Sequence, residues 1–68
     1  MIDKLIEEGR SFFMTACCLK DRGNAEGWFV FGKAIEIDHI LRDILGAECM
    51  LTEGYIYAYN KARETFNW

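Results

Sequence analysis

Residues 28–45 form the most apolar run of the chain, and they constrain its fold more than any other feature. Their apolar side chains recur at alternating spacings of four and three residues: Val30, Ala34, Ile37, Leu41 and Ile44, with Ile40 and Leu45 widening the stripe. This is the periodicity of an α-helix with one apolar face. Proline, the commonest helix breaker, is absent from all 68 residues. The run therefore predicts a central helix over residues 25–45, whose stripe builds the protein's own core.

Two further helices are predicted around it. Residues 2–20 have a clear apolar side, and Gly9 in its middle should let a neighbouring helix approach closely. Gly23 and Asn24 then end one helix and begin the next. A third helix is expected over residues 47–66, with Thr52 as an alternative N-cap. The sequence thus predicts an all-α fold, a small three-helix antiparallel bundle that forms a single helical domain over residues 1–68.

A chain this short buries a small core, and such chains usually gain support from disulfides, a metal or oligomerisation. Three cysteines, Cys17, Cys18 and Cys49, include an adjacent pair and form a poor disulfide framework. We therefore expect a reducing, cytoplasmic environment and a homodimer or higher oligomer packed through the central helix. No apolar run is long enough to predict a membrane span.

The composition argues against several functions. The net charge of −3 disfavours nucleic-acid binding, because nucleic-acid binders usually present a basic face. Ser11, the threonines and the cysteines lack a sequence context that would activate a nucleophile, and no glycine-rich phosphate loop is present. We expect neither an enzyme nor a cofactor, and a nucleic-acid-associated regulator remains only a second alternative.

Several large side chains lie outside the predicted core stripe. Trp28, Phe31 and Ile35 make the first half of the central helix apolar almost all round. The third helix, a second copy of the chain or another protein could cover them. The predicted contact surface comprises Trp28, Phe31, Ile35, His39, Met50, Tyr57 and Trp68. We therefore expect a small cytosolic protein–protein interaction module, regulatory or inhibitory, that occupies a partner's surface.

A metal site is the first alternative function. Glu36, His39 and Asp43 share one helical face, and the Glu-x-x-His spacing resembles the carboxylate–histidine pair of ferritin-like di-iron helices. Two copies of the chain would supply two such pairs, and Glu48 or Glu53 could add a further ligand. The competing interpretation is a solvated face on which His39 and Asp43 simply pair.

Overall fold

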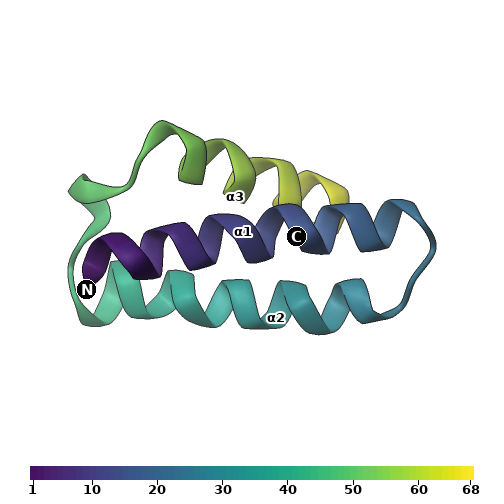
Figure 1. The fold of residues 1–68 in the computed structure, drawn as a ribbon, viewed down its shortest axis with the longest axis horizontal. Coiled ribbons are helices and arrows are strands. Elements are labelled where there is room, and N and C mark those ends of the chain that lie inside the picture. The colour runs from purple at the N-terminus through teal and green to yellow at the C-terminus, as the bar shows by residue number, and fades with distance from the viewer.

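The computed structural model describes residues 1–68 and contains three α-helices that lie side by side (Figure 1). Its elements, in chain order, are α1 (Ile2–Asp21), α2 (Glu26–His39), the π-helical turn η1 (Ile40–Ile44), the 3₁₀ turn η2 (Glu48–Met50) and α3 (Glu53–Thr65). No strand is present, which confirms the predicted all-α class. None of the helices combines the length and the apolar character that crossing a membrane requires.

The turn between α1 and α2 confirms the predicted role of Gly23, but the N-cap of α2 is Ala25 and not Asn24 as predicted. Gly23 has a φ of +74°, the left-handed conformation that glycine adopts without a steric penalty. The side-chain oxygen of Asn24 accepts a hydrogen bond from the backbone N–H of Glu26, with a donor–acceptor distance of 2.9 Å. This short turn makes α1 and α2 antiparallel neighbours (Figure 1).

The third helix begins six residues later than the main prediction. The hydroxyl of Thr52 accepts a hydrogen bond from the backbone N–H of Tyr55 at 3.1 Å, so Thr52 is the N-cap and α3 starts at Glu53. The expectation of a helix from residue 47 is wrong, and the Thr52 alternative is right. Gly46, at a φ of +59°, separates η1 from the turn that follows it.

The end of the second helix also differs from the expected regular helix over residues 25–45. The backbone N–H of Leu45 bonds to the carbonyl of Ile40, five residues earlier, at 2.8 Å. This spacing defines a π-helical turn, which is wider than an α-helical one. As a result, Ile44 and Leu45 lie exposed at one end of the bundle instead of continuing the core stripe.

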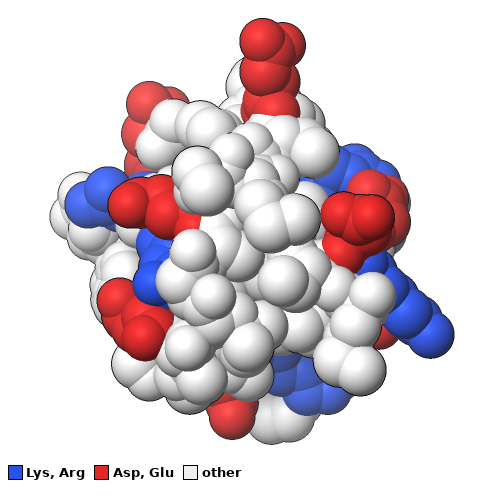
Figure 2. All heavy atoms as spheres, turned by 90° about the vertical axis from the view of Figure 1, so that its left-hand side faces the viewer, with Lys and Arg blue, Asp and Glu red and all other residues white.

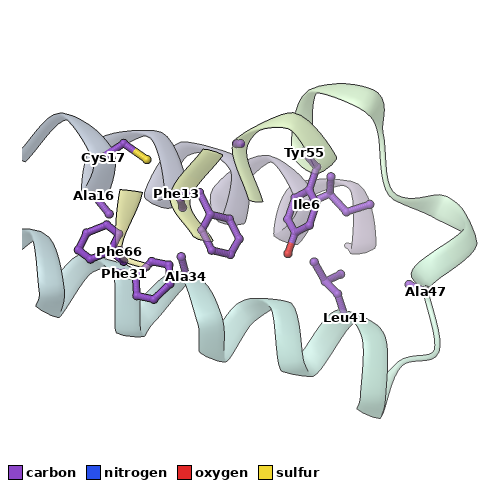
Figure 3. Close-up of a cluster of buried hydrophobic side chains, with 12 residues drawn as sticks. Ile6, Phe13, Ala16, Cys17, Phe31, Ala34, Leu41, Ala47, Tyr55 and Phe66 are labelled. Carbon is purple, nitrogen blue, oxygen red and sulfur yellow. The ribbon is translucent and has the colours of Figure 1, made fainter. Parts of the chain in front are cut away.

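The core is built around Phe13 of α1 (Figure 3). The rings of Phe31, Tyr55 and Tyr59 contact the Phe13 ring edge-on, with centroid distances of 6.2, 5.8 and 5.5 Å. The buried hydrophobic set is Ile6, Phe13, Ala16, Cys17, Phe31, Ala34, Leu41, Ala47, Tyr55, Ala58, Ala62 and Phe66. Each of the three helices contributes to it.

The central helix of the bundle is α1, not α2 as the sequence predicted. Only α1 packs closely against both other helices (Figure 1). Small residues permit this approach: a Cβ placed on Gly9 would lie 2.8 Å from the ring of Tyr55, and one on Gly27 would lie 3.0 Å from the backbone nitrogen of Lys20. The predicted role of Gly9 in close helix packing is confirmed. Bulky aromatic side chains, by contrast, hold α2 and α3 apart.

The buried side of α2 is rotated away from the predicted stripe. Val30 and Ile37 are only half-buried and Ile44 is 65% exposed, whereas Phe31 is 4% exposed. The reason is that α2 meets α1 on one side and the large side chains of α3 on another. Its buried residues therefore centre between those two neighbours, on Ala34 and Asp38.

A polar network, buried at Tyr55 and Asp38 and exposed at Glu48, links α3 to α2. The hydroxyl of Tyr55 donates to Asp38 Oδ1 at 2.6 Å, and Arg42 Nε donates to the same oxygen at 2.9 Å. Arg42 Nη1 also donates to Glu48 Oε2 at 2.9 Å, and its guanidinium lies 4.7 Å from the centre of the Tyr59 ring. Burial and the hydrogen bond to Asp38 raise the pKa of Tyr55 well above its ordinary value. Because buried polar groups are costly when unpaired, this network favours one placement of α3.

Candidate protein-binding surfaces

Four aromatic rings meet where α2 begins and α3 ends. Phe31 and Phe66 stack face to face, with ring centroids 4.3 Å apart and an angle of 14° between the ring planes. Trp28 contacts Phe66 edge-on at 4.8 Å, and Trp68 contacts Phe31 edge-on at 5.7 Å. The phenylalanines are buried, but Trp28 and Trp68 are 54% and 60% exposed. We call these four residues the aromatic edge.

Lys20, near the end of α1, adds a positive charge to the aromatic edge. Its Nζ atom lies 5.8 Å from the centre of the Trp28 ring and 5.7 Å from that of Phe66, within the range of cation–π attraction. A shallow hollow of about 210 Å³ opens beside it, lined by Lys20, Gly23, Asn24, Ala25 and Trp28. The aromatic edge thus combines apolar rings with a cation and polar groups at its margin.

The structure brings together only part of the predicted contact surface. Trp28 and Trp68 meet in the aromatic edge, but Phe31 lies beneath them in the core, so the expectation that Phe31 is off the core is wrong. The ring of Phe66 covers it, because α3 ends against the start of α2. Ile35 is half-buried against the core, and His39 is exposed further along α2.

Met50 and Tyr57 lie apart from the aromatic edge. Met50 belongs to η2, at the opposite end of the bundle from the turn beside Trp28 (Figure 1). Tyr57 is exposed on α3 and takes part in none of the aromatic contacts of the edge. The seven predicted residues therefore do not form one continuous surface.

A second exposed surface lies over α1 and α2, and sequence reasoning missed it. Phe29, Lys33, Glu36 and Ile40 follow one another at spacings of four, three and four, which places them on one side of α2 and of the first residue of η1; the first three are exposed and Ile40 is half-buried. Lys33 Nζ lies 4.9 Å from the centre of the Phe29 ring and 6.0 Å from that of Phe12 on α1. Phe29 is 67% exposed. We call these five residues, Phe12 included, the outer face; the helical spacing was the signal that could have revealed it.

A third apolar region lies at the end of the bundle where the N-terminus meets η1 and η2. Figure 2 looks onto this end and shows an uncharged middle surrounded by acidic and basic side chains. Ile44, Leu45 and Met50 are exposed here, together with Met1. The bundle is 19 by 19 Å across, compared with a length of 34 Å, so this end is smaller than a long side of the bundle.

The residues proposed as metal ligands do not gather into one group. His39 Nδ1 and Asp43 Oδ2 form an exposed pair at 2.7 Å, and Glu48 binds Arg42 instead. No three histidine, cysteine or acidic side chains come together in a group that could hold a metal ion. Cys17 is buried, and Cys18 and Cys49 are exposed, with no disulfide between any of them.

Comparison with known proteins finds no family model, no curated protein and no solved structure that matches the chain.

Proposed function

We propose that the protein is a small protein–protein interaction module that regulates or inhibits its partner by covering part of the partner's surface. The aromatic edge is the binding surface in this proposal. The observation that carries it is the pair of exposed tryptophans, Trp28 and Trp68, seated on the buried Phe31–Phe66 stack. Tryptophan is among the residues most enriched where binding energy concentrates in protein interfaces.

Rigidity supports this role. Each tryptophan ring packs edge-on against a buried phenylalanine, which restricts its rotation before a partner arrives. Binding then costs less side-chain entropy than it would with freely rotating rings. Lys20 beside the rings favours a partner whose contact surface carries acidic groups at its rim.

The cytosol is the compartment that this proposal implies. None of the three cysteines forms a disulfide in the structure. Unpaired thiols, one of them buried and two exposed, are typical of proteins kept in a reducing compartment.

Affinity capture from the native cell, quantified by mass spectrometry, tests the proposal. We expect a protein that is recovered with the wild type and reduced at least tenfold with Trp28→Ala or Trp68→Ala, since a central tryptophan contributes about 2 kcal/mol or more. Tyr57→Ala is the matched control, because it removes an equally exposed aromatic ring outside the aromatic edge. Circular dichroism checks that every variant keeps its helices. Equal recovery of all captured proteins with all four chains would refute the aromatic edge as the binding surface.

A further inference from the structure

We infer that the outer face binds a second copy of this chain, through antiparallel pairing of the two α2 helices. This goes beyond the proposed function, since it concerns a different surface and names the occupant. The order of residues along the outer face points to this pairing. An apolar residue lies at each end, Phe29 and Ile40, and a pair of opposite charges, Lys33 and Glu36, lies between them.

This order is self-complementary about a two-fold axis. The pair Phe29 and Ile40 and the pair Lys33 and Glu36 have the same midpoint along α2. A two-fold axis through that midpoint places Phe29 against the partner's Ile40 and, at the same time, brings Lys33 within reach of the partner's Glu36. Each contact then occurs twice, as a two-fold symmetric interface requires.

The charges select the antiparallel orientation. In a parallel pairing, Lys33 would face the partner's Lys33 and Glu36 would face the partner's Glu36. Like charges across an interface cost free energy, whereas the antiparallel pairing gives two opposite-charge contacts. Phe29, 67% exposed in the single chain, is covered only in the paired arrangement.

The dimensions of the bundle also favour this face. A whole long side of 34 by 19 Å projects to roughly 650 Å², which sets the upper scale of a contact on that side and lies at the lower end of the ~600–1,000 Å² per partner of standard stable interfaces. The loop end, 19 by 19 Å, projects to roughly 360 Å², which falls well short of that area. Only 15 of the 68 residues are buried in the single chain. Chains with so small a core are commonly stabilised by oligomerisation.

Exchanging the charges of Lys33 and Glu36 tests whether a second copy of the chain is the partner and whether the two α2 helices pair in the antiparallel orientation. Lys33→Glu and Glu36→Lys each put like charges against one another at two places, and each should weaken dimerisation at least tenfold in sedimentation experiments under reducing conditions. The double exchange, Lys33→Glu/Glu36→Lys, should restore the wild-type dissociation constant within about threefold.

Mixing the two single variants is the sharpest version of this test. In the mixture, the glutamate introduced by Lys33→Glu meets the lysine introduced by Glu36→Lys, and the unchanged Glu36 of the first variant meets the unchanged Lys33 of the second. An affinity tag on one variant should therefore recover the other in equal amount, although each variant alone dimerises at least tenfold more weakly than the wild type. A monomeric wild type, single variants that dimerise as the wild type does, or a mixture that fails to pair would each overturn the inference.

Trp68→Ala separates this inference from the proposed function. Trp68 belongs to the aromatic edge and not to the outer face, so this variant should dimerise as the wild type does and still lose the captured partner. Conversely, Lys33→Glu should keep the partner. Loss of dimerisation on Trp68→Ala would overturn the outer face as the site of self-association, while leaving the aromatic edge as a binding surface.

Discussion

Two opposite sides of α2 carry similar apolar side chains in the sequence, but the structure buries one side and leaves the other exposed. Phe31 and Phe29, two residues apart, point to different sides of the helix. Phe31 is enclosed by Phe13, Phe66 and Trp68, while Phe29 contacts only the Lys33 ammonium among charged and aromatic groups. The apolar character of a helix therefore does not determine which of its sides the same chain will cover.

What separates the two sides is the placement of α3. The hydroxyl of Tyr55 points towards α2 (Figure 3) and bonds to Asp38, which lies on the same side of α2 as Phe31. Aromatic contacts at Phe66 then complete the attachment. Lys33 and Glu36, on the other side of α2, are exposed and form no bond to α3, so that side remains open.

The largest expected difference in the free energy of unfolding is that between Phe31→Ala and Phe29→Ala, which remove one ring from each side of α2. Phe31→Ala should lower the free energy of unfolding by about 3–5 kcal/mol, because it leaves a cavity against Phe13 and Phe66. Phe29→Ala should change it by less than about 0.5 kcal/mol in the dissociated chain, because the ring is exposed. Urea unfolding followed by circular dichroism measures both.

Protein concentration provides the control for this first comparison. At low concentration, the free energies of unfolding of the two variants should differ by the amounts given above. At high concentration, Phe29→Ala should also lose the stabilisation that self-association gives to the wild type. Equal destabilisation by the two substitutions at low concentration would show that α2 is covered on both sides within one chain.

A smaller effect is expected from removing the bond that places α3. Tyr55→Phe keeps the buried ring and deletes only the hydroxyl that donates to Asp38, so the free energy of unfolding should fall by about 1–3 kcal/mol. Asp38 keeps its hydrogen bond from Arg42, which limits the loss. Unchanged stability in urea would contradict the assigned role of this bond.

The pH dependence of stability gives an independent signature of the same bond. The pKa of Tyr55 is raised in the folded chain, first by burial and then by its hydrogen bond to Asp38, above the ordinary value of 10.0 that applies when unfolded. Tyr55 thus stabilises the fold fully below pH 10, and its contribution falls by about 1.4 kcal/mol per pH unit as the pH rises beyond that value. Subtracting the Tyr55→Phe profile from the wild-type profile isolates this slope.

Local sequence signals predict that three helices form and that Gly23 ends the first, but not where the third helix begins, since both residue 47 and Thr52 were compatible with the sequence. The glycine and asparagine at residues 23 and 24 act through short-range geometry, and Gly9 acts through its missing side chain. The π-helical turn at Ile40–Ile44 was not predictable in this way, because the wider turn breaks the regular spacing that the prediction assumed.

The candidate surfaces were harder to predict because they depend on where α3 lies. The exposed tryptophans were identified, but Phe31 was assigned to the same surface, since spacing alone cannot show that Phe66 covers it. Asp38 carried no distinguishing signal, as its role depends on Tyr55, 17 residues away. The sequence shows that Phe29 and Ile40 share one side of the helix. It does not show that this side stays uncovered, because that depends on where α3 lies.

The smallest expected changes in the free energy of unfolding come from alanine substitutions at two glycines of α2, and the two changes should have opposite signs. A Cβ on Gly27 would lie 3.0 Å from the backbone nitrogen of Lys20 and 3.1 Å from the carbonyl oxygen of Ala16, and backbone atoms of α1 cannot move aside easily. Gly27→Ala should therefore lower the free energy of unfolding by about 1 kcal/mol.

A Cβ on Gly32 meets nothing within 4 Å, so Gly32→Ala should raise that free energy by about 0.5–1 kcal/mol through helix propensity alone. Thermal and urea unfolding at low protein concentration would measure both variants. If Gly32→Ala destabilised the dissociated chain, the side of α2 that carries Gly32 would have to be in contact with another part of the same chain.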